Sequence, residues 1–157
     1  MVEKQSLSKY ASIINRFSMQ FYDQELSDSQ IGAGQYFFLV RIHEEQGLTG
    51  QELACKGHFD KATATRALQK LEELSYIRRE ADREDKRKCR FYTTEKAKPI
   101  INKVYDAVDK WNGVLQKDMK EEEAKLTGKL MNQMAKNAYE YISSLIEGDK
   151  NGRNSNL

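Results

Sequence analysis

The fold is decided by the stretch from Leu48 to Thr94, which reads LTGQELACKGHFDKATATRALQKLEELSYIRREADREDKRKCRFYTT. This stretch contains two short helical patterns on either side of a turn. Two basic, β-prone runs follow, and a charged tip separates them. Two helices and a hairpin in this order predict a winged helix-turn-helix, a fold that can place one helix in the major groove of DNA with a hairpin beside it.

The first half of this stretch predicts the helix-turn-helix itself. Thr49 and Glu52 have the spacing of a capping box, so a short helix is expected to begin there. Gly57 is expected to supply the turn, and Phe59 is expected to anchor the next helix from a buried position. Asp60 is the expected N-cap of that second helix, because a short side-chain oxygen can accept hydrogen bonds from its first amides.

The helix expected over residues 61–74 is the candidate recognition helix. Its inward-facing residues are expected to be Ala64, Leu68, Leu71 and Leu74. The opposite face, near the N-terminus, combines small side chains with long basic ones, which can approach base edges and reach phosphates or guanine. The candidates for DNA contact here are Asp60, Lys61, Thr63, Ala64, Thr65 and Arg66. An ordinary amphipathic helix would give the same pattern, so this helix alone leaves both interpretations open.

Two strands are expected at Tyr76–Ala81 and Lys88–Thr93, where the residue types alternate. Between them lies the charged run DREDKR. Asp85 and Arg87 are two residues apart in this run and are expected to point the same way. An Arg held by a carboxylate can enter a narrow minor groove, where the negative potential is enhanced. The remaining phosphate-contact candidates are Thr49, Gln51, Lys70, Arg78, Lys86, Lys88 and Arg90.

The spacing of apolar residues in the rest of the chain predicts helices, so the expected fold class is mainly α. Amphipathic helices are expected over residues 7–22, with Ser6 or Ser8 as the cap, and over 35–45, where a buried strand is the alternative. A last helix is expected over 120–146, and the polar residues 148–157 predict a disordered tail. After Thr94, apolar residues recur at steps of four and three in a heptad-like seam formed by Ala97, Ile101, Val104, Val108, Trp111 and Leu115.

These helices carry more apolar surface than one small winged helix needs to cover its own core. One interpretation is a homodimer, which two DNA half-sites one helical turn apart would require. The other is a helical bundle within one chain. The sequence leaves both open.

The distribution of charge favours an anionic partner, and the composition gives no sign of a metal site, a cofactor motif or a catalytic arrangement. The net charge of the 157 residues is only +2, but residues 49–99 contain 13 Lys and Arg and 9 Asp and Glu, a net of +4. This segment favours an anionic partner, although a solvated charged face is the alternative. The two cysteines lack CxxC spacing, and neither a signal peptide nor a membrane-spanning run is present, so a cytoplasmic protein with free thiols is expected. No metal site, cofactor motif or catalytic arrangement is predicted.

The same stretch resembles the MarR (multiple-antibiotic-resistance regulator) family of bacterial transcription factors. The matching residues are Leu48, Thr49, Glu52, Leu53, Ala54, Thr65, Arg66, Leu71, Ile77, Asp82, Asp85, Arg87, Thr94, Glu95 and Lys96. Ser75 and Ala97 stand where the family commonly has glycine, and Glu84 stands where it often has Arg. Ser75 would be strained in the left-handed position after the recognition helix.

The resemblance implies a single domain over residues 1–147, with a DNA-binding lobe over about 35–96 and dimerisation helices over about 5–24 and 97–147. It implies a homodimer that represses or activates transcription at a pseudo-palindromic operator on double-stranded DNA. It also implies relief by a small aromatic or phenolic ligand or by thiol oxidation. By position, the ligand cleft would be lined by Tyr10, Ile14, Phe17, Phe38, Arg41 and His43, each of which could equally be plain core.

Two other functions stay open from the residues. A redox-responsive regulator would use Cys55 or Cys89, and the basic neighbours Lys88 and Arg90 would activate the thiol of Cys89. A winged helix that docks onto protein would have a more apolar recognition face and no need of the Asp85–Arg87 pair.

Overall fold

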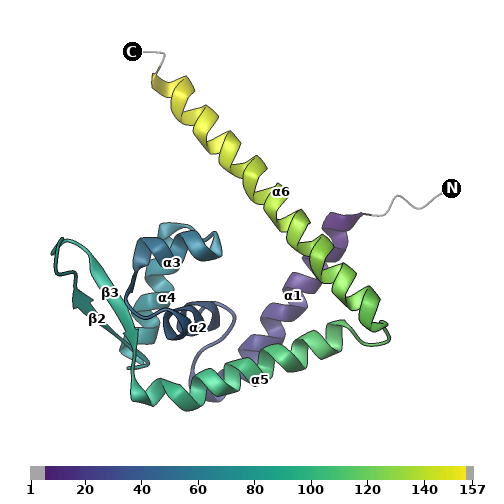
Figure 1. The fold of residues 1–157 in the computed structure, drawn as a ribbon, viewed down its shortest axis with the longest axis horizontal. Coiled ribbons are helices and arrows are strands. Elements are labelled where there is room, and N and C mark those ends of the chain that lie inside the picture. The colour runs from purple at the N-terminus through teal and green to yellow at the C-terminus, as the bar shows by residue number, and fades with distance from the viewer. Residues whose placement is uncertain (1–5, 155–157) are drawn as a thin grey trace. The chain divides into compact units, whose positions relative to one another are not determined.

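The computed structural model describes residues 6–154, with side chains up to Ile146. The chain divides into two compact units, Met1–Val114 and Leu115–Leu157. The first unit combines helices with a small antiparallel sheet, and the second contains one long helix (Figure 1). The predicted mainly α fold class is therefore confirmed. None of the described helices is both long and apolar enough to cross a membrane.

The first unit follows the predicted order of elements. Its helices are α1 (Leu7–Glu25), α2 (Tyr36–Glu44), α3 (Gly50–Gly57), α4 (Lys61–Glu73) and α5 (Lys98–Leu115), and its strands are β1 (Leu48–Thr49), β2 (Ile77–Ala81) and β3 (Cys89–Thr93). Short 3₁₀ turns lie at Ser27–Ser29 and Glu95–Ala97. The segment around residues 35–45 is the predicted helix and not the alternative strand. The Oγ of Ser6 accepts the Lys9 amide and caps α1, as expected.

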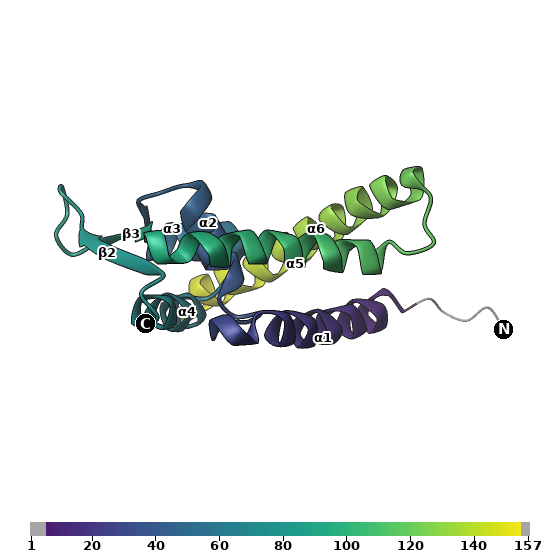
Figure 2. The same cartoon turned by 90° about the horizontal axis from the view of Figure 1, so that it is seen from below.

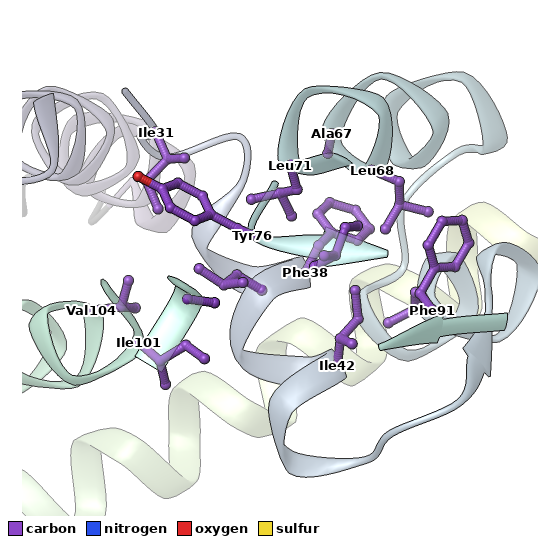
Figure 3. Packing of buried hydrophobic residues seen from close by; sticks show 14 of the residues in the cluster. Ile31, Phe38, Ile42, Ala67, Leu68, Leu71, Tyr76, Phe91, Ile101 and Val104 are labelled. Carbon is purple, nitrogen blue, oxygen red and sulfur yellow. The ribbon is translucent and has the colours of Figure 1, made fainter. Parts of the chain in front are cut away.

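The core of the lobe lies where α2, α3 and α4 meet the sheet (Figure 3). Phe38, Leu39 and Ile42 of α2 have no exposed surface. They belong to one cluster of buried residues that also includes Leu53, Leu68, Leu71, Ile77, Phe91, Ile101 and Val104. Because this cluster draws on every element from α2 to α5, it fixes α4 and the hairpin relative to each other.

The turn between α3 and α4 differs from the prediction. Thr49 and Glu52 do form the capping box, but the left-handed residue is His58, with φ of 56°, and not Gly57. Gly57 is needed for a different reason: a Cβ there would lie 2.6 Å from Cε1 of Phe37 and would also collide with Phe59. Phe59 itself is 38% exposed. It covers Phe37 and Phe38 from outside, so the prediction that it is a buried anchor is wrong.

The sheet has the order β1–β3–β2, and both pairs are antiparallel. The sequence did not predict β1, whose two residues are defined only by pairing, with Leu48 opposite Phe91. In the hairpin, Arg78 pairs with Tyr92 and Arg79 pairs with Phe91. The tip of the hairpin projects away from the helices of the lobe in both views (Figures 1 and 2). Ser75 takes the left-handed conformation that the family pattern implied, with φ of 60°.

The apolar seam of α5 packs largely within its own chain. Ile101, Val104 and Ala107 are buried in the core cluster. Further along, Trp111 stacks on Phe21 of α1 with ring centroids 4.8 Å apart. Its indole donates to the Ser18 hydroxyl at 2.8 Å, and α1 and α5 lie side by side here (Figure 2). The seam from Ile101 to Trp111 is therefore in contact with other residues of the first unit. Packing within one chain is the alternative to a dimer that the sequence left open.

The second unit is dominated by α6 (Glu121–Asn154). The helix extends beyond the expected end near residue 146, into the segment 148–154 that was expected to be a disordered tail. Once a helix is nucleated, each further residue adds a hydrogen bond, which can offset the poor propensity of glycine. Residues 155–157 of the expected tail lie outside the described residues. The single domain over 1–147, with its lobe and dimerisation helices, stays a prediction.

Candidate nucleic-acid interface

The N-terminus of α4 is organised by its cap. The carboxylate of Asp60 accepts the Thr63 amide at 2.9 Å and the Thr63 hydroxyl at 2.6 Å. These bonds, the hydroxyl first, lower the pKa of Asp60. Asp60 is therefore the N-cap of α4, as the sequence predicts. Its carboxylate holds the first turn of the helix.

Beyond the cap, α4 presents an exposed polar face. Lys61, Thr65 and Arg66 are exposed, and Thr63 is half-buried. The Thr65 hydroxyl donates to the Lys61 carbonyl at 2.8 Å, so its oxygen can still accept a hydrogen bond. Ala64, however, is only 2% exposed and belongs to the core. Its place among the groove-facing candidates is wrong, because it shares the inward face with Ala67, Leu68 and Leu71.

The hairpin of β2 and β3 with its connecting turn, residues 77–93, is called the wing. It contains the predicted ion pair between Asp85 and Arg87. The Nε of Arg87 donates to Oδ1 of Asp85 at 3.1 Å, and its backbone amide donates to the same oxygen. The side chain of Arg87 is 91% exposed, whereas that of Asp85 is about one-third exposed. The carboxylate thus aims an otherwise solvated guanidinium. Lys86 and Lys88 beside it are also exposed.

The turn of the wing depends on Asp82, whose role the sequence did not reveal. Its carboxylate is almost fully buried and accepts the amides of Glu84 and Asp85, each at 2.8 Å. It also accepts a hydrogen bond from Nε of Arg90, whose Nη1 donates to the Gly47 carbonyl at 2.8 Å. Arg90, predicted to contact phosphate, is instead a brace between the wing and the loop before β1.

We predict that this buried carboxylate makes stability depend on pH. Hydrogen bonds from the Asp85 amide, the Arg90 guanidinium and the Glu84 amide lower the pKa of Asp82 to about 2. Its stabilising contribution is fully present above the unfolded-state pKa of about 3.9 and is lost as pH falls toward 2. The melting temperatures of the wild type and of Asp82→Asn should therefore differ most above pH 4 and converge below it. A constant difference from pH 5 to pH 2 would contradict this account.

Two grooves flank α4. One, of about 620 Å³, lies between α4 and the wing, and its polar lining residues are Lys61, Thr65, Gln69, Glu72, Arg79 and Arg87. The other, of about 470 Å³, lies between α3 and α4 and is rimmed by Gln51, Cys55, Lys61 and Thr65. The structure thus brings the candidates Lys61, Thr65 and Arg87 together in one groove. It adds Gln69 and Arg79, which the sequence analysis did not select.

Three of the other candidates for phosphate contact do not line the groove between α4 and the wing. Arg78 lies on the face of the hairpin away from α4, where it pairs with Glu80 and its guanidinium lies 4.8 Å from the centre of the Tyr92 ring. The Thr49 hydroxyl is engaged with Glu52 in the capping box. Lys70 is exposed near the C-terminal end of α4. Adjacent arginines on a strand point to opposite faces, so the sequence could have shown that only one of Arg78 and Arg79 faces α4, but not which.

The candidate ligand residues do not form one site. Tyr10, Phe17 and His43 are exposed, Ile14 is half-buried, and Phe38 is enclosed in the core. Arg41 does line a hollow of about 250 Å³ between α2 and α5, together with Tyr36, Phe37, Val40, Glu44, Tyr105 and Val108. There Arg41 pairs with Glu44 at 2.9 Å, and Glu44 also accepts the Tyr105 hydroxyl at 3.2 Å.

The thiols are free: Cys55 is exposed, and Cys89 is half-buried in the groove beside the wing. A redox role for either stays a prediction. Among the side chains that the structure describes, no group of three or more His, Cys, Asp or Glu is placed to hold a metal ion.

Two helices joined by a tight turn, followed by a hairpin with a cationic tip, define a winged helix-turn-helix protein. Residues 31–89 match the MarR family model. A solved MarR structure is 33% identical and covers 92% of this chain and 98% of its own, with a TM-score of 0.79. The HTH-type transcriptional regulator YybA of Bacillus subtilis is 37% identical over 48% of this chain, a match that spans 51% of that relative. BilQ of Clostridium symbiosum, also an HTH-type transcriptional regulator, is 26% identical over 85% of this chain and 92% of its own length.

The chain therefore belongs to the MarR family of helix-turn-helix transcriptional regulators. The relatives that it matches are transcriptional regulators, which are not enzymes.

Proposed function

We propose that this regulator binds double-stranded DNA as a homodimer at a pseudo-palindromic operator and acts as a repressor. In each half-site α4 occupies the major groove and Arg87 enters the adjacent minor groove. The observation that carries the proposal is the Asp85–Arg87 pair, in which a guanidinium 91% exposed is held in one direction by a carboxylate. Such a group suits the enhanced negative potential of a narrow minor groove.

The face of α4 supports the major-groove assignment. Lys61 and Arg66 can reach phosphates or guanine, and Thr65 offers a methyl group to thymine. Lys86 and Lys88 add positive charge along the wing. A dimer that neutralises about ten phosphates would show a slope near −9 in a plot of log affinity against log salt concentration.

The homodimer is supported by exposed apolar side chains on helices α1 and α6, each considered by itself. Those of α6 are Leu126, Leu130, Met131, Met134, Tyr141, Ile142, Leu145 and Ile146, and those of α1 are Leu7, Tyr10, Phe17 and Met19. On α6 they recur at steps of three and four in adjacent rows, a stripe wide enough to contact more than one helix. Contiguous apolar surface of this kind marks a protein–protein contact.

We predict that Leu130→Asp weakens the dimer. A carboxylate in the middle of a buried apolar stripe would lose its hydration, so dissociation should become measurable at micromolar protein. Light scattering should give twice the 18.2 kDa chain mass for the wild type and a lower mass for the variant. Lys129→Glu, one residue away but off the stripe, is the control and should stay dimeric. A monomeric wild type would contradict the dimer.

For relief of repression we propose the hollow between α2 and α5, which contains Arg41 but none of the other ligand candidates selected from the sequence. Its wall is mainly aromatic and aliphatic, and Arg41, which pairs with Glu44 there at 2.9 Å, supplies a cation. A small aromatic or phenolic anion could use both features. A ligand bound there would change the packing of α2 against α5, and both helices contribute residues to the core of the lobe.

The test is selection of bound duplexes from a random pool, carried out with and without benzoate as an aromatic anion. The expected result is one enriched pseudo-palindrome with steep salt dependence, and recovery that falls when benzoate is present. A flat salt dependence with no enriched sequence would overturn DNA binding. Enrichment that benzoate does not change would overturn only its role as an effector. In a reporter strain, deletion of the regulator should raise transcription from a promoter that contains the enriched sequence.

A further inference from the structure

The groove between α4 and the wing lies where one sugar–phosphate strand of bound DNA would run. If α4 lies in the major groove and Arg87 in the neighbouring minor groove, one sugar–phosphate strand must pass between them. The groove of about 620 Å³ is where that strand would run, and Gln69 and Arg79 line it together with Lys61 and Arg87. We propose that Arg79 and Gln69 are the residues that hold this strand. The proposal rests on the function proposed above.

The register of the hairpin assigns the contact to Arg79 rather than to its neighbour. Arg79 lies opposite Phe91, whose ring faces the core and α4, whereas Arg78 lies opposite Tyr92 on the other face. Both side chains are about equally exposed, at 59% and 54%, and both pair with a glutamate. The two arginines therefore differ chiefly in the direction they face.

The partner of Arg79 explains how an acidic residue can lie beside a phosphate strand. Glu72 of α4 is also in the groove, and its Oε1 forms an ion pair with Nε of Arg79 at 3.0 Å. The ion pair is made through Nε and leaves the terminal amino groups of the guanidinium for a phosphate. Arg79 thus neutralises Glu72 and presents its remaining donors to the DNA, while Gln69, one turn before Glu72, can add an uncharged amide donor.

The test compares four variants on the selected duplex as salt is varied. Arg79→Gln should bind about tenfold more weakly, and its salt slope should be shallower by about two, because a dimer loses two phosphate contacts. Arg78→Gln is the matched control and should keep the wild-type affinity and slope. Arg79→Lys, which retains the charge, should keep most of the slope. Gln69→Ala should weaken binding a few-fold with no change in slope, since it removes no charge.

Glu72→Gln separates contact with DNA from a structural role. If Arg79 touches phosphate, removing the acidic partner should leave the slope unchanged and hold or raise the affinity. If Arg79 only fastens β2 to α4, Glu72→Gln should lose binding and melting temperature as Arg79→Gln does, and the proposal is overturned. Equal slopes for the wild type and Arg79→Gln also overturn it. A wild type that binds no DNA would instead refute the proposed function.

Discussion

Arg87→Ala is expected to reduce operator affinity about 100-fold or more. Each half-site loses a hydrogen-bonded cation in a groove of strong negative potential, at about 1.5–3 kcal/mol per site. The loss should be largest for operators with A·T-rich flanks, where the minor groove is narrow. Melting should be almost unchanged, because the side chain is 91% exposed and pairs only with Asp85 within its own turn. Fluorescence anisotropy with labelled duplexes, at several salt concentrations, measures the effect.

Arg83→Ala is the matched control for charge. It removes the same charge from the same tip, but Arg83 lines a hollow with Arg90 and Tyr92 on the outer side of the wing. Its effect should be several-fold weaker. Equal losses for the two variants would mean that the wing acts by net charge alone and that Asp85 does not direct Arg87.

Phe38→Ala is expected to lower the free energy of unfolding by about 3–5 kcal/mol. Phe38 has no exposed surface and lies at the centre of the cluster in Figure 3, so its removal leaves a cavity between α2, α4 and the sheet. Urea unfolding followed by circular dichroism would show a lower midpoint with an unchanged slope. This residue was one of the candidates for ligand contact, and its enclosure assigns it to the core.

Phe59→Ala provides the comparison. Phe59 packs on Phe38 with ring centroids 4.9 Å apart, but it is 38% exposed, so its truncation should cost only about 1–2 kcal/mol. If the two variants lost equal stability, Phe59 would be the buried anchor that its sequence position suggests, and the observed burial would be contradicted.

Much of the local structure could be predicted because it depends on residues a few positions apart. The Thr49–Glu52 capping box and the Asp60 N-cap follow from sequence neighbours, whereas the left-handed Ser75 was implied by the family resemblance. The Asp85–Arg87 pair is of the same kind, since two positions on one turn determine whether the side chains meet. These elements supply most of the evidence for the family and for the minor-groove proposal.

The candidate site was less predictable where residues far apart in the chain meet. Ala64 was expected both on the inward face of the helix and among the groove-facing candidates, and its burial against the rest of the lobe decides for the core. Arg90 looks like a phosphate contact, but the buried carboxylate of Asp82 and the carbonyl of Gly47, 43 residues away, engage it as a brace. Charge in the sequence cannot distinguish a free cation from one with such partners.

The sequence by itself determined the order of the elements, the caps of the helices, the paired arginine of the wing and the family. Only the tertiary structure decided that Arg79 and not Arg78 faces α4, that Phe38 and not Phe59 is enclosed, and that the seam of α5 packs on its own chain as far as Trp111. The physical reason is the range of the interactions. Caps and turns are settled within a few residues, whereas strand register and burial depend on contacts between segments that only the folded chain brings together.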